Sequence, residues 1–107
     1  DAKNYCADVS LISDGALCYG ENTLSFAVKN VGVQTIDAVQ VGIASETMDY
    51  EIKVKDSSLI EEESLSKKVP YAYTGGTVEV TVLPLIESNG ELHECQDKGF
   101  VKTLTEC

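Results

Sequence analysis

Apolar and polar residues alternate along most of this chain with a period of two, the pattern of strands that bury one face. Leu24, Phe26 and Val28 alternate with small or polar residues, and the same period recurs over residues 39–43, 50–55 and 78–82. Each stretch predicts a β-strand. Sustained helical periodicity is absent from the sequence, so the pattern predicts an all-β chain.

Turn residues separate the predicted strands. Asn89-Gly90 tolerates the positive φ angles of a tight hairpin, so residues 91–96 are predicted to double back as a strand. The Asp-Lys-Gly sequence at residues 97–99 predicts a second tight turn before a terminal strand over residues 100–106. Near the start, Ser-Asp-Gly at residues 13–15 predicts either a hairpin or one strand broken by a bulge, and both readings stay open.

The two prolines mark places where a ladder of hydrogen bonds is interrupted. Residues 69–73 alternate as a strand, and Pro70 cannot donate to a ladder, which predicts a sheet edge or a crossing between sheets. The alternation breaks at residues 83–86 around Pro84, which predicts a bulge or an exit at a sheet edge. Residues 57–68 are predicted to form a loop that enters a strand.

Together these segments predict an immunoglobulin-like antiparallel β-sandwich. Seven to nine short strands, with turn signals at intervals of roughly 8 to 12 residues, are typical of that architecture. At 107 residues the chain has the length of one domain, so residues 1–107 are predicted to form a single sandwich.

The net charge of the chain limits the classes of binding partner that can be expected. The formal net charge is −10, from 18 acidic and 8 basic residues. Nucleic-acid phosphates and anionic membrane surfaces attract clustered Lys and Arg, so neither nucleic-acid binding nor direct membrane insertion by this segment is predicted. No cofactor-binding motif occurs in the sequence, and no cofactor is predicted.

The four cysteines, Cys6, Cys18, Cys95 and Cys107, predict two disulfides. An even number of cysteines in a small chain that starts at Asp1 without an initiator Met indicates a processed protein in an oxidising compartment, hence a secreted or cell-surface location. The close cysteine pairs of a zinc site are missing, so no metal ligands are predicted.

Four cysteines permit three pairings. Cys6 with Cys18 and Cys95 with Cys107 would close short local loops. A tight hairpin at Lys98 would however leave Cys107 too far from Cys95. Cys6 with Cys95 and Cys18 with Cys107 suits two parallel terminal strands of equal spacing, and this pairing is slightly preferred.

The stretch Leu-Ser-Phe-Ala-Val-Lys-Asn-Val-Gly at residues 24–32, followed by Ile36 and the strand over residues 39–43, resembles a known corner. That corner is the V-x-N-x-G corner of prokaryotic cell-surface immunoglobulin-like modules. The sequence is similar to CARDB-like domains and, more closely, to the extracellular domains of archaeal pilin and archaellin-like proteins. The resemblance implies a subunit or outer domain of a surface filament. The apolar N-terminal helix of pilins does not occur in this sequence, so either it was removed or this is a different surface protein with the same sandwich.

Catalytic chemistry finds little support. His93 is the only histidine, all four cysteines are better used in bridges, and no G-x-S-x-G elbow occurs. The acidic run at residues 61–63 lacks the alternating oxygen ligands of a calcium loop and is predicted to be a solvated turn. We therefore predict no enzyme activity and no catalytic residue.

Two functions remain. The first is a structural protein that associates with itself through exposed sheet edges near Pro70 or the Leu83-Pro84 exit. The second is an adhesion module that binds glycans or other cell-surface proteins through exposed aromatic residues, for which the candidates are Tyr5, Tyr19, Tyr50, Tyr71 and Tyr73. Tyr71 and Tyr73 are placed on one strand face and are predicted to lie in the core.

Overall fold

The computed structural model describes residues 5–107 and is built almost entirely from strands. Residues 5–107 hold ten strands, with a 3₁₀ turn between the eighth and the ninth, and no α-helix lies within this range. The elements are β1 (Leu11–Ser13), β2 (Cys18–Gly20), β3 (Thr23–Asn30), β4 (Ala38–Ala44), β5 (Asp49–Val54), β6 (Ser64–Pro70), β7 (Glu79–Ser88), β8 (Glu91–Glu94), η2 (Gln96–Lys98), β9 (Phe100–Thr103) and β10 (Thr105–Glu106). Residues 5–107 contain no helix long and apolar enough to cross a membrane.

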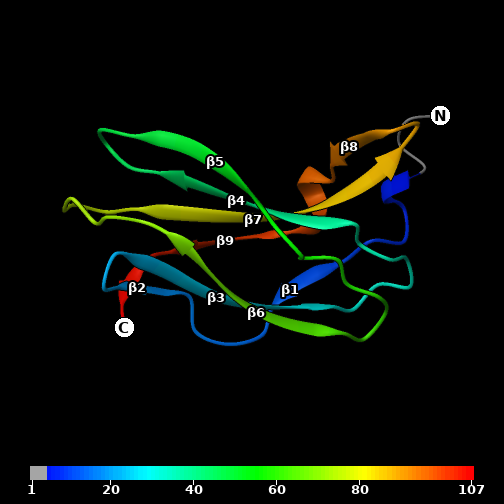
Figure 1. Cartoon of the computed structure of the whole chain (residues 1–107), viewed down its shortest axis with the longest axis horizontal. Coiled ribbons are helices and arrows are strands. Elements are labelled where there is room, and N and C mark those ends of the chain that lie inside the picture. Colours follow the sequence, from blue (N-terminus) through cyan, green and yellow to red (C-terminus); the bar gives the residue numbers. More distant parts are fainter. Residues whose placement is uncertain (1–4) are drawn as a thin grey trace.

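Two five-stranded sheets face each other and confirm the predicted sandwich (Figure 1). The first sheet has β3 at its centre, with β6 on one side and β1 and β2 on the other. The second sheet runs in the order β5-β4-β7, with β8 and β9 both paired to the far side of β7. The molecule measures 41 × 25 × 20 Å, and the N- and C-terminal regions lie toward opposite ends of its long axis (Figure 1).

The first terminal strand is one strand broken by a bulge. β1 and β2 pair antiparallel with the same side of β3, with Ser13 opposite Val28 and Cys18 opposite Ser25. The register therefore shifts by two residues across residues 14–17, which bulge out of the sheet. Of the two alternatives that the sequence left open, the structure has the bulge and not the hairpin.

The strand formed by β8 and β9 in the second sheet is interrupted in a similar way. The tight turn predicted at residues 97–99 is wrong, because the chain does not reverse its direction there. η2 forms a single 3₁₀ turn there, after which β9 continues along β7 in the same direction as β8. Gly99 lies so close to Val82 that a Cβ on it would overlap the Val82 carbonyl oxygen. Glycine is therefore needed here because the two chain segments lie so close together, and the chain does not reverse direction at this residue.

The bulge or sheet exit predicted at residues 83–86 is also wrong for β7, because β7 runs through these residues as the central strand of its sheet and pairs with β4 without a break in register. Pro84 lies opposite Val39 of β4, and its carbonyl oxygen accepts a hydrogen bond from the Cys95 N–H at 3.0 Å. Backbone groups of Pro84 thus point toward the junction between β8 and β9. The missing N–H of the proline falls at this gap in the ladder, where a strand tolerates it.

The core lies between the sheets and consists of the alternating apolar residues that the pattern singled out. Leu24, Phe26 and Val28 of β3 are at most 2% exposed, and they face the buried valines and isoleucines of β4 and β7. The fully buried β4 and β7 residues in this cluster are Val39, Val41, Ile43, Val80, Val82 and Ile86. Burial of branched and aromatic side chains on one face of each sheet is the main stabilising contribution.

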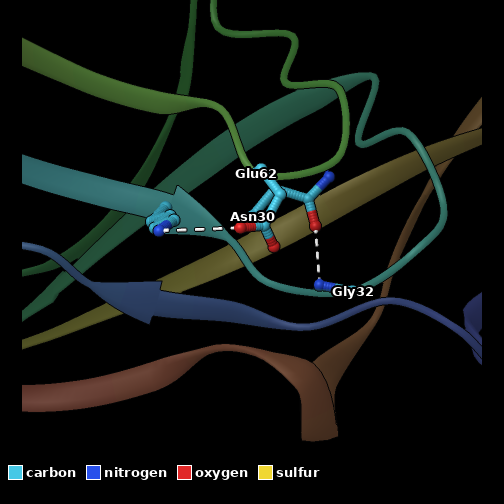
Figure 2. A network of polar contacts seen from close by, with 4 residues as sticks. Asn30, Gly32 and Glu62 are labelled. Carbon is cyan, nitrogen blue, oxygen red and sulfur yellow. Dashed lines mark hydrogen bonds and ion pairs between the residues drawn. The ribbon is translucent and has the colours of Figure 1, made fainter.

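The corner after β3 is fixed by one buried amide. Asn30 is 0% exposed, and its side-chain nitrogen donates to the carbonyl oxygens of Gln34 at 2.9 Å and Leu59 at 3.0 Å. Its side-chain oxygen accepts from the Gly32 N–H at 3.0 Å (Figure 2). A Cβ on Gly32 would overlap the Asp8 carbonyl oxygen, so this position requires glycine. The hydrogen bonds of Asn30 and the close approach at Gly32 therefore explain the Asn-x-Gly motif.

Candidate functional site

The two disulfides lie toward opposite ends of the sandwich and tie both terminal segments to it. Cys6 is bonded to Cys95, with a Cα–Cα distance of 5.7 Å, and Cys18 is bonded to Cys107, with a Cα–Cα distance of 5.0 Å. This is the long-range pairing that the sequence slightly favoured. Each bridge spans 89 positions, so each closes a loop of most of the chain.

Two segments of equal length connect the bridges. We call residues 6–18 the first arm and residues 95–107 the second arm; Cys18 follows Cys6 by 12 positions, as Cys107 follows Cys95. The arms lie side by side and run in the same direction, because β10 pairs parallel with β2. Lys102 Nζ also donates to Ser13 Oγ at 2.9 Å, and Cys107 N–H donates to the Tyr19 carbonyl oxygen at 2.9 Å.

Three tyrosines gather beside the Cys18–Cys107 bridge. The rings of Tyr19 and Tyr73 stack with centroids 4.2 Å apart, and Tyr71 meets Tyr19 edge-on at 6.4 Å. Tyr71 is 7% exposed and belongs to the core as predicted, but Tyr73 is 42% exposed, so the core assignment of Tyr73 is wrong. β6 ends at Pro70, and both tyrosines lie in the segment that crosses between the sheets, which confirms the crossing predicted at that proline.

The tyrosine cluster has altered acidity. Burial raises the pKa of Tyr71, with nearby Tyr50 and Tyr73 adding to the effect. Burial also raises the pKa of Tyr19, and Tyr73 and the Glu106 carboxylate add to that shift. The neutral phenols are therefore favoured in the folded state, because ionised oxygens there would be poorly solvated and close to other negative charge.

These shifts predict a loss of stability in alkali. Because the folded-state pKa values lie above the unfolded ones, their contribution to stability is fully present below about pH 10 and is lost as the pH rises through the folded values. We expect urea midpoints to fall as the pH rises above about 10, and to fall less in Tyr71→Phe, which keeps the ring and removes the titrating group. Tyrosinate absorbance at 295 nm would measure the ionisation directly. A buried tyrosine that ionises below the pH of a free one would contradict this assignment.

The two sheet edges on the opposite side from the arms differ in how open they are. Among the residues that the structure describes, β6 pairs only with β3, and Lys67 lies directly opposite the buried Phe26, on the inner face of the sheet. A charged residue on the inner face of an edge strand discourages a further strand from joining. Pro70, which the sequence placed at an edge or crossing, ends this same strand.

The edge of β5 carries no such protection. Within residues 5–107, β5 pairs with β4 only. Ser45 N–H donates to the Met48 carbonyl oxygen at 2.8 Å, which sets the alternation of the hairpin, so Asp49, Glu51 and Lys53 direct their backbone N–H groups away from β4. The inner face of β5 carries the half-buried Tyr50 and Ile52. This edge can accept another strand without disturbing the ladder.

The side chains of Tyr5 and His93 pack against each other. The Tyr5 ring lies 4.7 Å from the His93 ring, centroid to centroid, and Tyr5 lines the groove beside the Cys6–Cys95 bridge. The shallow groove beside that bridge is lined by Glu94, Asp97 and Lys98, among others, and both of its cysteine sulfurs are bonded. Over residues 5–107, no three His, Cys, Asp or Glu side chains come together in a group that could hold a metal ion.

Comparison with known proteins adds a shared architecture. No family model and no curated protein matches the sequence. Among solved structures, the chain is similar to the archaellum periplasmic stator protein FlaG from Sulfolobus acidocaldarius, with a TM-score of 0.59 and 14% identity over 89% of this chain and 98% of that one. A weaker likeness, with a TM-score of 0.43 and 16% identity over 92% and 94% of the chains, is to a CARDB domain from Pyrococcus furiosus solved with di-metal ions. At such identity, the likeness to FlaG shows the fold.

Proposed function

We propose that this protein is a non-catalytic extracellular structural protein, a subunit or outer domain of a cell-surface filament. The observation that carries the proposal is the pair of disulfides that fix both terminal segments to opposite ends of the sandwich. Long-range disulfides of this kind persist in oxidising environments outside the cytosol. They stabilise the ends of the chain, where an assembly subunit would otherwise fray.

The likeness to FlaG is compatible with this proposal, because that protein is described as an archaellum periplasmic stator protein. It concerns the fold, and the filament role here is our inference. Electron microscopy of intact producing cells, with gold-labelled antibodies against this chain, tests it. Labelled surface filaments are the expected result, and labelling confined to the cell interior would contradict the proposal.

We further propose that copies associate through the free edge of β5. Backbone N–H groups at Asp49, Glu51 and Lys53 point outward there, and strand addition uses main-chain hydrogen bonds without needing a reactive side chain. The net charge of −10 opposes such contact at long range, so association should strengthen as salt screens the charge.

A proline in β5 tests this edge. Glu51→Pro removes one outward N–H and leaves the β4 ladder intact, so we expect self-association to be lost while the melting temperature changes by only a few degrees. Glu51→Ala is the matched control and should associate like the wild type. Sedimentation velocity over a range of protein concentrations measures both. Equal association of the two variants, or a wild type that stays monomeric at high concentration and high salt, would rule out this edge.

The stacked pair Tyr19 and Tyr73 favours a second function, an adhesion module. An exposed aromatic stack offers the flat apolar surface on which sugar rings and apolar side chains pack, and Tyr73 is the exposed member. Binding to a glycan array that disappears in Tyr73→Ala but survives in Tyr5→Ala would favour this function. No binding by the wild-type protein would remove it.

A further inference from the structure

The two bridges and the two arms form a closed covalent ring. Starting from Cys6, the ring follows the first arm to Cys18, crosses to Cys107, returns along the second arm to Cys95 and crosses back to Cys6. Residues 19–94, which include β3 to β7 and most of the core, form a separate loop attached to this ring at Cys18 and Cys95. The core strands are therefore outside the shortest covalent path between the two ends of the molecule.

That covalent path is short compared with the whole chain. Twelve residues span at most roughly 40 to 43 Å, and a bridge adds a Cα–Cα distance of 5.0 or 5.7 Å. The folded molecule is itself 41 Å long, with the terminal regions toward its opposite ends (Figure 1). Without the bridges, the chain from Cys6 to Cys107 would reach roughly 340 Å when fully extended.

From this geometry we propose that the protein is a tether of covalently fixed length, which transmits tension between its two ends through the arms while the sandwich core stays unstretched. The inference goes beyond the proposed surface role and holds for the isolated molecule. Attachments at the two ends would stay within about 50 Å of each other, measured from Cys6 to Cys107, whatever happens to the core.

The equal length of the arms has a mechanical consequence. Both arms start at one bridge and end at the other, so both become taut at the same extension and share the tension. A shorter arm would become taut first and carry the whole force. With either bridge alone, the covalent path between the two ends would still run through one arm and leave out the core. The length limit would therefore survive the loss of one bridge.

Single-molecule stretching of the full chain, held by peptide tags at its two ends, tests the proposal. We expect the oxidised wild type to lengthen by no more than about 30 Å, including the slack of the first residues, and to retrace the same curve on relaxation. The single-bridge variants, Cys6→Ala with Cys95→Ala and Cys18→Ala with Cys107→Ala, should keep this limit. The variant without any cysteine should lengthen by about 300 Å, as should the wild type in a reducing agent.

A step of about 300 Å in the oxidised wild type would overturn the proposal. The comparison stays informative if the cysteine-free variant does not fold, because an unfolded chain reaches the same final length without a step. A protein that shows the length limit but is missing from the cell surface would disprove the filament role and leave the tether intact. The reverse result would disprove the tether alone.

Discussion

Replacing Cys18 and Cys107 together by alanine should lower the free energy of unfolding by about 3 to 4 kcal/mol. While the Cys6–Cys95 bridge is intact, the second bridge closes a ring made only of the two arms, roughly 26 residues, and the loop-entropy model gives this value for a ring of that size. Urea unfolding of the oxidised proteins measures the difference. Cys107 is exposed, so this pair can be removed with little loss of packing.

Removing both bridges should cost more than twice as much as removing this one. The last bridge closes a loop of 89 positions, worth about 4 to 5 kcal/mol, which brings the total to about 8 kcal/mol. That is comparable to the whole stability of an ordinary domain, so the cysteine-free protein should be marginally folded at best. If removing the last remaining bridge lowered the free energy of unfolding by less than removing the first one did, the ring would be contradicted. Cys6→Ala with Cys95→Ala should cost somewhat more than the other pair, because Cys95 is 2% exposed and packs in the core.

The second large effect is expected at the corner after β3. Asn30→Ala should lower the free energy of unfolding by about 3 to 4 kcal/mol, because it leaves the Leu59 and Gln34 carbonyl oxygens and the Gly32 N–H without their partner in a buried site. Denaturant unfolding of the oxidised protein measures this loss. A loss below about 1 kcal/mol would show that water replaces the amide and that Asn30 does not fix the corner.

Asn30→Asp is the matched comparison, because it keeps the shape and one acceptor and replaces the amide donors by a carboxylate. The buried carboxyl would face two carbonyl oxygens, so its folded-state pKa should be raised above the usual value near 3.9. A raised folded pKa means that the neutral form is favoured in the folded state. The destabilisation should therefore be smallest in acid and grow as the pH rises through the folded pKa, whereas the deficit of Asn30→Ala should show no such dependence.

The alternating strands could be predicted from sequence because each has one buried face. Leu24, Phe26 and Val28 alternate in sequence and are all buried in the structure. β7 could be read only in part, because Leu83, Leu85 and Ile86 are all buried and the alternation disappears. A central strand covered on both faces and a strand that leaves its sheet give the same break in the pattern.

Turn residues showed where the chain bends and left its direction undetermined. Asn89-Gly90 does form the predicted hairpin between β7 and β8. The Asp-Lys-Gly turn at residues 97–99 has similar residues but carries the chain onward into β9, since β7 still offers free partners at residues 79–82. That outcome depends on a strand distant in sequence, which local turn chemistry does not encode.

The candidate sites depended even more on distant contacts. The Tyr19–Tyr73 stack joins residues 54 positions apart, and no feature of the sequence pairs them. Tyr73 shares its spacing with the buried Tyr71, but the chain is leaving the first sheet at that point, so the strand pattern no longer applies. The disulfide pairing was the exception, because the equal spacing of the cysteines already favoured two parallel terminal segments.

The central claim is that Cys6 pairs with Cys95 and Cys18 with Cys107, and non-reducing peptide mapping tests it most directly. Cleavage before aspartate and after lysine separates the four cysteines into residues 4–7, 14–29, 69–96 and 103–107. We predict that residues 4–7 are linked to 69–96 and that residues 14–29 are linked to 103–107. Residues 4–7 linked to 14–29, or any fragment with a free thiol, would contradict the ring, the fixed length and the stability differences that follow from it.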